Sequence, residues 1–225
     1  MDSTSNIVKV LILGGGLQTS HLFAANSGVL ADKLRLDRIA QCTYTENLDF
    51  LRAENLRQFD VLLIYAWRAN GHDGSIENDA QKQGLLDFVE GGKGLIVVHV
   101  GVGSFDDWED YGEIVGRIYL EGQSTEVPYG TFDVQIQDPD HPTMRGLRDF
   151  EIKDELYQRL VVRKSGLPVL VTAQGEDGVE PMVWINRLGN GRIFVTALGH
   201  GPETWRNEHY QQLLINAIRW VSRQS

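Results

Sequence analysis

Continuous apolar runs of strand length recur along the first half of the chain. They lie at Val8–Leu13, Asp60–Ala66 and Gly94–His99. Runs without a polar alternation are typical of parallel strands that are buried on both faces of a sheet. This pattern predicts a parallel β-sheet at the centre of the protein.

An amphipathic segment lies between the second and third of these runs. Asn78 can cap a helix that ends at Glu90, and Gln81 occupies the capping-box position. Strand, helix and strand in this order form a right-handed βαβ unit, and the same order of elements occurs over residues 7–44. We therefore expect an α/β fold with an open, mostly parallel sheet and helices on both faces.

The last third of the chain changes to short strands joined by tight turns. We expect strands at Pro168–Thr172, Met182–Asn186 and Arg192–Ala197, with Gly189-Asn190-Gly191 as the hairpin turn between the last two. A final helix near Asn207–Arg223 carries an apolar face that should dock on the sheet. These elements predict an antiparallel C-terminal extension of the sheet.

The whole chain, residues 1–225, is expected to form a single domain. Its 225 residues are 42% apolar, which is enough to bury one substantial core. It carries no internal repeat, no low-complexity tract and no linker rich in Pro, Gly or Ser.

Charge and cysteine content disfavour several classes of partner. The 31 acidic and 21 basic residues give a net charge of -10, which repels nucleic acid and an anionic membrane surface. No apolar run approaches the roughly 20 residues that a membrane-spanning helix requires. The single cysteine, Cys42, allows no intrachain disulfide. We expect a cytoplasmic protein without a nucleic-acid or membrane partner, and a homo-oligomer is compatible with the sequence.

Histidines follow several of the apolar strands. His21 follows the first strand, His72 lies beyond the second, His99 ends the third and His200 follows the last. Ligands of open α/β sheets bind beyond the carboxyl ends of the strands. One histidine there is as readily structural as functional, but several at one rim are typical of an acid–base or metal site. The sequence therefore predicts a histidine-lined site at this rim.

Aromatic side chains occupy the same strand ends. Tyr65 and Trp67 close the second apolar run, and Trp108 and Trp205 lie in two later segments that also carry acidic residues. Flat aromatic faces beside carboxylates suit a sugar ring, which packs its C–H face on the aromatic and bonds the acids through its hydroxyls. We take these four as candidate carbohydrate-binding residues. The acids beside Trp108 are better explained as residues of a helix N-terminus.

Neither a thiol nucleophile nor a dinucleotide cofactor fits the pattern. His99 stands at a strand-to-turn junction where related sheets place a nucleophile, whereas Cys42 belongs to another predicted strand, Arg38–Tyr44. The run Gly14–Gly16 lacks the third glycine of a dinucleotide fingerprint, because position 19 is Thr19. Thiol catalysis and a nicotinamide cofactor are both disfavoured.

Several motifs are spread in register over nearly the whole chain. They are Gly94–His99, Phe105–Trp108, Tyr111–Gly116, Asp140–Pro142 with Gly146-Leu147, Asp154–Tyr157, Thr196–His200, Trp205 and Ile218–Trp220. In order and spacing these motifs resemble the trehalose-utilisation (ThuA-like) family. Several motifs in register are far more specific than any one of them.

The resemblance implies a flavodoxin-like fold of the class I glutamine amidotransferase type without the amidotransferase cysteine. It also implies a link to disaccharide catabolism through 3-keto sugars. The family's site positions map onto four residues of this chain: His21, His99, Glu155 and His200. Tyr157, in the same motif as the glutamate, is a further candidate for substrate binding. One position departs from the family, because Gln123 stands where many members carry a histidine.

Two hypotheses about function stay open. In the first, a lyase, hydrolase or isomerase acts on a small keto-sugar or glycoside, with His99 and His200 as an acid–base pair and Glu155 orienting or donating. This enzyme requires no cofactor, or it holds one zinc-like divalent ion on His21, His99, Glu155 and His200. In the second, a non-catalytic sugar-binding or regulatory module retains a degenerate amidotransferase scaffold.

Overall fold

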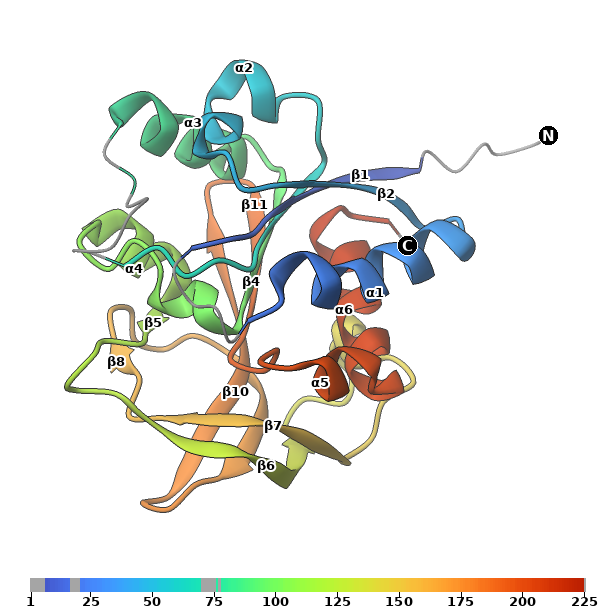
Figure 1. The fold of residues 1–225 in the computed structure, drawn as a ribbon, viewed down its shortest axis with the longest axis vertical. Coiled ribbons are helices and arrows are strands. Elements are labelled where there is room, and N and C mark those ends of the chain that lie inside the picture. The colour runs from blue at the N-terminus through green and yellow to red at the C-terminus, as the bar shows by residue number, and fades with distance from the viewer. Residues whose placement is uncertain (1–6, 17–20, 70–75, 77, 225) are drawn as a thin grey trace.

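The computed structural model describes residues 7–16, 21–69, 76 and 78–224. Two sequence positions discussed above, His72 and Thr19, lie outside the described residues. The described chain is built around one long mixed β-sheet that runs through the middle of the molecule (Figure 1).

Nine strands form this sheet within the described residues. In chain order they are β1 Val8–Leu13, β2 Ala40–Thr45, β3 Val61–Ile64, β4 Gly94–Val98, β6 Thr125–Ile136, β7 Phe150–Gln158, β9 Val169–Gln174, β10 Val179–Leu188 and β11 Gly191–Thr196. Their spatial order is β2-β1-β3-β4-β11-β10-β9-β6-β7. Two short strands, β5 Arg117–Ile118 and β8 Val161–Val162, pair separately.

The sheet has a parallel half and an antiparallel half. Strands β2, β1, β3, β4 and β11 are parallel neighbours. Strands β10, β9, β6 and β7 continue the sheet in antiparallel pairs, and Figure 1 shows them at the lower end of the molecule. The predicted parallel sheet with an antiparallel extension is therefore confirmed.

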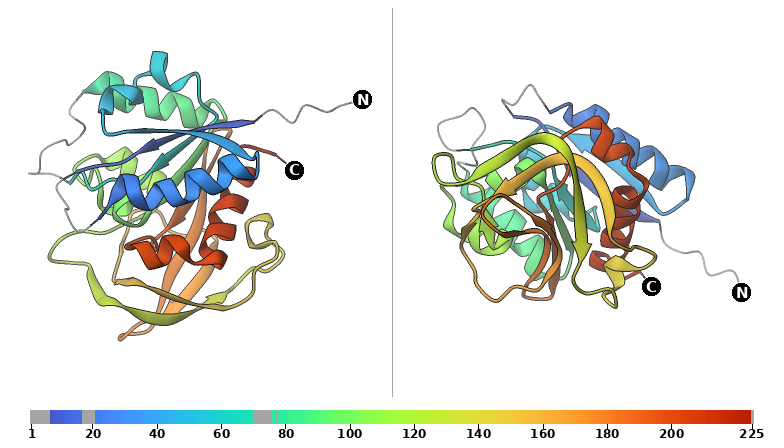
Figure 2. Two further views of the ribbon diagram at one scale, coloured as in Figure 1. Left: turned by 45° about the vertical axis from the view of Figure 1, so that its right-hand side comes forward. Right: turned by 90° about the horizontal axis from the view of Figure 1, so that it is seen from below.

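Helices cover both faces of the parallel half, as the sequence predicts. They are α1 Phe23–Leu36, α2 Ala53–Leu56, α3 Asp79–Glu90, α4 Glu109–Val115, α5 Pro202–Arg206 and α6 Glu208–Val221, with 3-10 turns η1 Leu48–Leu51, η2 His99–Gly103 and η3 Pro142–Met144. Figure 2 shows α1, α5 and α6 on one side of the sheet and α3 and α4 on the other.

The last helix shows how the sequence pattern produces packing. The Asn207 side chain accepts hydrogen bonds from the backbone N–H groups of His209 and Tyr210, which caps α6. The predicted apolar face of α6 is buried along its length: Leu213, Leu214, Ala217, Ile218 and Val221. The helix therefore docks through that face on β4 and β11.

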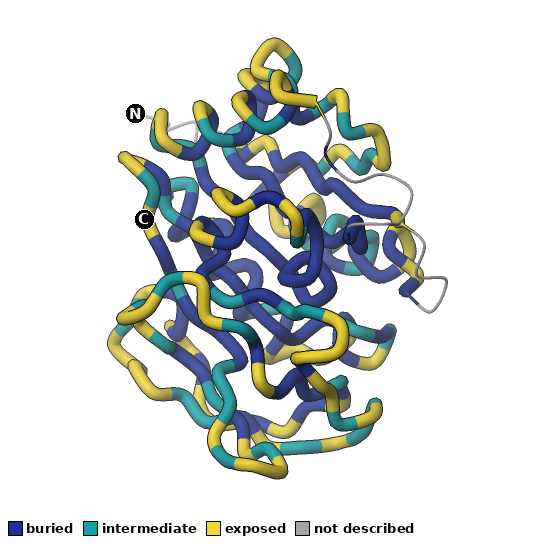
Figure 3. Tube along the Cα trace, turned by 90° about the vertical axis from the view of Figure 1, so that its left-hand side faces the viewer, coloured by how far each residue is buried: buried dark blue, intermediate teal, exposed yellow. Residues whose placement is uncertain are grey.

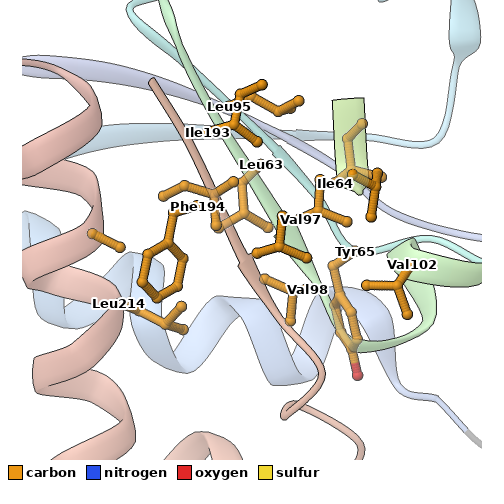
Figure 4. Close-up of a cluster of buried hydrophobic side chains, with 14 of the residues drawn as sticks. Leu63, Ile64, Tyr65, Leu95, Val97, Val98, Val102, Ile193, Phe194 and Leu214 are labelled. Atoms are coloured by element: carbon orange, nitrogen blue, oxygen red, sulfur yellow. The ribbon is translucent and has the colours of Figure 1, made fainter. Parts of the chain in front are cut away.

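The hydrophobic core lies between α6 and the central strands. Figure 3 shows buried chain along the middle of the molecule and exposed chain at its rim. In Figure 4, Phe194 of β11 points toward Leu214 of α6, with Leu63 and Val97 of the neighbouring strands beside them. All four of these side chains are fully buried. This packing holds in place the strand ends that carry the histidines.

Two long strands were missing from the sequence-based expectation. The residues of β6 alternate irregularly between exposed and half-buried positions, and β7 carries acidic and basic residues between its buried ones. In β6 no regular alternation indicates a strand, and in β7 the alternation of Phe150, Ile152 and Leu156 is interrupted by Asp154, a charged residue at a buried position. The predicted strand Gly94–His99 also ends one residue early, because His99 begins η2.

Within the part of the chain that the structure describes, no helix combines the length and the apolar character needed to cross a bilayer.

Replacing Phe194 with Ala should lower the free energy of unfolding by about 3–5 kcal/mol, because a large buried ring is lost from a packed site. Urea denaturation measures this change. Leu36→Ala is the matched control, since Leu36 is 70% exposed and its replacement should change stability far less. Equal losses in the two variants would contradict this account of the core.

Candidate active site

His99 sits on a sharp turn at the end of β4. Its backbone φ is 48°, a left-handed conformation that is uncommon for a residue with a side chain. Its side chain is fully buried. The loop after β11 approaches this turn so closely that a Cβ on Gly199 would lie 3.2 Å from the Cβ of His99. A glycine at position 199 therefore lets the two strand ends meet.

The backbone around His99 determines which of its ring nitrogens carries a proton. Its Nδ1 lies 2.7 Å from the carbonyl oxygen of Ala197, and because a carbonyl only accepts, Nδ1–H must be the donor. In the neutral ring Nε2 is then the proton acceptor. The Tyr157 hydroxyl lies 3.2 Å from this nitrogen and donates to it.

Glu155 and His200 form an ion pair beside His99. His200 Nδ1 lies 2.9 Å from Glu155 Oε2 and 3.3 Å from His99 Nε2. Burial opposes the charge on Glu155, but the hydrogen bond from His200 and the nearby His99 ring hold the pKa of this carboxyl well below its usual range. Burial also opposes the charge on His200, but the hydrogen bond and the negative charge of Glu155 raise the pKa of this imidazole. The pair therefore favours a carboxylate and an imidazolium.

His21 completes the cluster in a different protonation state. Its side chain is buried, and its ring centroid lies 4.5 Å from that of His200 and 5.2 Å from that of His99. Burial, followed by the nearby rings of His99 and His200, lowers the pKa of His21 to about 3. His21 is therefore neutral at physiological pH.

The carboxylate of Asp154 positions the loop that carries His200. It is fully buried and accepts hydrogen bonds from the backbone N–H groups of Gly199 at 2.7 Å, His200 at 2.9 Å and Glu155 at 2.9 Å. Burial raises the pKa of Asp154, although His99 and these three donors act in the opposite direction. Sequence reasoning placed Asp154 in a motif but gave it no role, because only the folded chain brings residues 199 and 200 to it.

The structure brings together all four histidine and glutamate positions selected from the sequence. One ligating atom from each of His21, His99, Glu155 and His200 lies within 4.8 Å of the others. They come from four separate segments: the stretch before α1, the end of β4, strand β7 and the loop after β11. Their roles in catalysis or metal binding stay predictions.

A cleft of about 240 Å³ opens over this cluster. Its wall contains His21, Glu155 and His200, and the rings of Trp67 and Tyr157. A second hollow of about 150 Å³ shares Trp67 with the first. Gln123, the position that departs from the family, lines this second hollow.

The five aromatic candidates fall in three places. Trp67 and Tyr157 line the cleft. Tyr65 and Trp205 are fully buried and support the His200 loop, since Tyr65 donates to the His200 carbonyl at 3.2 Å and Trp205 Nε1 donates to the Gly199 carbonyl at 2.8 Å. Trp108 is buried at the start of α4, where its Nε1 lies 3.2 Å from Asp110, and it is not part of the cleft wall.

Sequence reasoning did not identify part of the cleft wall. Tyr119, Glu121 and Glu126 line the cleft, and the Tyr119 hydroxyl donates to Glu126. They lie between β5 and the first residues of β6, a stretch without a recognisable strand pattern. The nearby aromatic and acidic residue types were the only signal available.

Cys42 has no part in this site. It lies on β2, the strand at the edge of the sheet. Burial raises the pKa of its thiol to about 12, so the reactive thiolate is not populated at neutral pH. The prediction that thiol catalysis is disfavoured agrees with this position.

The structure defines an α/β protein with a glutamine amidotransferase-like fold in which a histidine occupies the strand-end turn. A glutamine amidotransferase from Thermotoga maritima superimposes with a TM-score of 0.52 at 9% identity, over 96% of this chain and 99% of that one. The trehalose-utilisation (ThuA) family matches residues 9–221, and this chain belongs to that family.

Two solved structures of ThuA-like proteins share the fold closely. The protein from Parabacteroides merdae is 20% identical with a TM-score of 0.82, over 96% of this chain and 90% of that one. The protein from Bacteroides uniformis is 20% identical with a TM-score of 0.77, over 98% of this chain and 94% of that one. No curated protein matches this chain in sequence.

Replacing Glu155 with Gln should lower the pKa of His200, because the groups that raise it are chiefly the Glu155 carboxylate and burial acts the other way. An NMR titration of the His200 ring measures this pKa. Exposed Glu54→Gln is the matched control. An unchanged His200 titration in Glu155→Gln would contradict the ion pair.

The same ion pair predicts a window of pH-dependent stability. The raised pKa of His200 contributes stability that is complete below about pH 6.5 and is lost as the pH rises through its folded value. The lowered pKa of Glu155 contributes stability that is present above about pH 4.3 and is lost at lower pH. Glu155→Gln should therefore cost most stability between these two values, as measured by urea denaturation across pH.

Proposed function

We propose that this ThuA-family protein is an enzyme that acts on a neutral keto-sugar or glycoside by acid–base chemistry in the histidine-lined cleft. One observation carries the proposal: His99 Nε2, the acceptor nitrogen of this ring when it is neutral, lies 3.3 Å from Nδ1 of His200, whose charged form Glu155 stabilises. Acid–base catalysis of a bond cleavage uses one group that accepts a proton and a second that donates one.

The chemistry of the cleft wall supports a neutral carbohydrate as the ligand. Three carboxylates line it, from Glu121, Glu126 and Glu155, and they would repel an anionic substrate. The rings of Trp67 and Tyr119 stand beside these acids. This combination suits hydroxyl groups on one side and an apolar ring face on the other.

The two joined hollows favour a ligand with more than one ring. The first lies over the histidines and the second continues past Trp67 and Tyr119 toward Gln123. A disaccharide can place its reacting ring over His200 and its second ring in the smaller hollow. The family's description, trehalose utilisation, agrees with a disaccharide.

His99 needs an intermediary to act as the base, because its side chain is fully buried. Tyr157 lines the cleft, and its hydroxyl donates to His99 Nε2. Burial raises the pKa of this phenol well above its usual value, so a free tyrosinate is disfavoured. A proton taken from substrate by the Tyr157 oxygen, as its own proton passes to His99, avoids that charged state.

A 3-keto glycoside gives these groups a balanced reaction. The hydrogen on C2 lies next to the C3 carbonyl and is acidified by it. Removal of this proton through Tyr157 to His99 breaks the C2–H bond, a C1–C2 double bond forms, and the C1–O bond to the second ring breaks. The imidazolium of His200 gives its proton to the departing oxygen, and Glu155 orients that imidazolium.

The same cluster also fits a divalent cation of the zinc type. The distances among His99 Nε2, His200 Nδ1 and Glu155 Oε2 are 3.3, 2.9 and 3.5 Å, close to the about 3.4 Å that separates tetrahedral zinc ligands. The bond from His99 Nδ1 to the Ala197 carbonyl is the outer contact typical of a metal-ligating histidine. His21, His99, Glu155 and His200 would hold the ion, which would polarise a substrate carbonyl when bound.

The second candidate function is a non-catalytic sugar-binding module. The full burial of His99 and the absence of a thiol at the strand-end turn are compatible with a scaffold that has lost its chemistry. Such a module would bind the same neutral carbohydrates in the same cleft but would release them unchanged.

Turnover of 3-keto disaccharides separates the two candidates. The wild type should convert a keto-disaccharide, and His99→Ala and Tyr157→Phe should each reduce kcat by about a hundredfold or more while binding persists. Tyr119→Phe is the matched control, because Tyr119 lines the cleft without contacting His99, and it should change KM more than kcat. Tight binding without turnover of any keto-sugar or glycoside would establish the binding module instead.

Metal content tests the divalent-ion version separately. Protein purified without chelator should retain about one zinc-like ion per chain by mass spectrometry, and chelator should lower its unfolding temperature. His99→Ala and Glu155→Gln should lose the ion, whereas His209→Ala, which removes an exposed histidine, should keep it. Turnover by metal-free protein would overturn the metal version and leave the acid–base proposal standing.

A further inference from the structure

A separate cavity, distinct from the cleft and from the hollow beside it, lies at the opposite end of β11 from the histidine cluster. His200 follows the last residue of β11, whereas Arg192 stands near its first. This cavity has a volume of about 290 Å³. Arginines from three parts of the chain line it: Arg145 after η3, Arg192 on β11, and Arg219 and Arg223 at the end of α6.

The sign of the charge in this cavity is opposite to that of the chain as a whole. The protein carries a net charge of -10, yet the wall of this cavity contains four arginines and no aspartate or glutamate. Within the described part of the chain, none of these four arginines takes part in an ion pair. The cavity therefore concentrates positive charge that no carboxylate of the described chain neutralises.

Arg192 is held in a fixed orientation at this cavity. Its Nη1 donates to the Trp220 carbonyl at 2.8 Å, and its guanidinium lies 5.4 Å from the Trp220 ring centroid. Its Nε is buried and has no hydrogen-bond partner among the described residues. Burial and the nearby charges of Arg223 and Arg187 lower the pKa of Arg192. These contacts leave a preorganised cation with hydrogen-bonding capacity still unused.

Local structural roles account for only part of the cluster. Arg223 donates to the carbonyls of Gly92 and Asn190, and its position beyond α6 suits the negative end of the helix dipole. Arg219 lies in the last turn of the same helix. Neither role explains why Arg145 and Arg192, from two other elements, face the same cavity.

We propose that this cavity binds a small phosphorylated molecule, a phosphate monoester. Guanidinium groups bind phosphate oxygens through paired hydrogen bonds, and several around one pocket match its charge and shape. Pro142 and Trp220 supply an apolar wall for the organic part of such a ligand. A polynucleotide is disfavoured, because the acidic surface of the rest of the chain would repel it.

Titration of the whole protein with inorganic phosphate and with glycerol 3-phosphate, followed by calorimetry at constant ionic strength, tests this site. Both anions should bind at one site per chain, and glycerol should not bind there. The NMR signal of the Trp220 indole N–H should shift on binding, which locates the site.

Arg145→Gln and Arg219→Gln, at two exposed positions, should each weaken binding by about tenfold or more. Arg57→Gln, a matched exposed arginine outside the cavity, should bind as the wild type does.

The outcomes separate the sources of the phosphate group. Tighter binding of glycerol 3-phosphate than of inorganic phosphate would support the monoester, and equal binding would assign the site to free phosphate. No binding of either anion at about 10 mM would overturn the site. Unchanged affinity in both Arg145→Gln and Arg219→Gln would overturn it as well. None of these readouts depends on the carbohydrate reaction.

Discussion

The buried carboxylate of Asp154 is the contact on which the histidine site depends. It lies on β7, near the edge of the antiparallel half, yet its hydrogen bonds go to the loop that leaves β11 in the centre of the sheet. An unpaired carboxylate at this depth would be costly, and three backbone donors offset that cost. Because those donors include the N–H groups of Gly199 and His200, the energetic need to solvate Asp154 also determines where the His200 side chain stands. A residue of the antiparallel half thus positions the loop after β11 that carries His200.

The protonation states of the cluster follow from the same arrangement. One carboxylate, Glu155, faces His200 at hydrogen-bond distance and stabilises its charge, while His21, more deeply buried beside other imidazoles, stays neutral. The His99 ring is oriented by the Ala197 carbonyl. Three imidazoles within a few ångströms therefore differ in charge or orientation, because each has a different neighbour. This separation is what an acid–base site requires.

The two ends of β11 carry opposite chemistry. The histidine cleft at its carboxyl end is lined by carboxylates, and the cavity at its amino end is lined by arginines. In an open α/β sheet the carboxyl ends of the strands are the usual place for a ligand, so the cleft agrees with the rule and the arginine cavity does not. The arginine cavity depends on α6, which packs on β11, and on η3, which packs on α6.

The sequence by itself determined the elements whose apolar pattern is regular. Strand β1 and the helix over 79–90 were predicted within a residue or two, and the hairpin at Gly189-Asn190 was predicted from its turn residues. Three of the four polar site residues were also selectable as histidines at strand ends, and the family resemblance indicates all four, Glu155 included.

Tertiary structure alone decided the rest. The long strand β6 carries no regular alternation, and in β7 the alternation is interrupted by the buried Asp154, whose part exists only once residues 45 or more positions away fold against it. Trp205 and Tyr65 were chosen as aromatic residues near a histidine, but only packing shows that they support its loop from inside, because a sequence pattern does not tell on which side of a backbone a side chain lies.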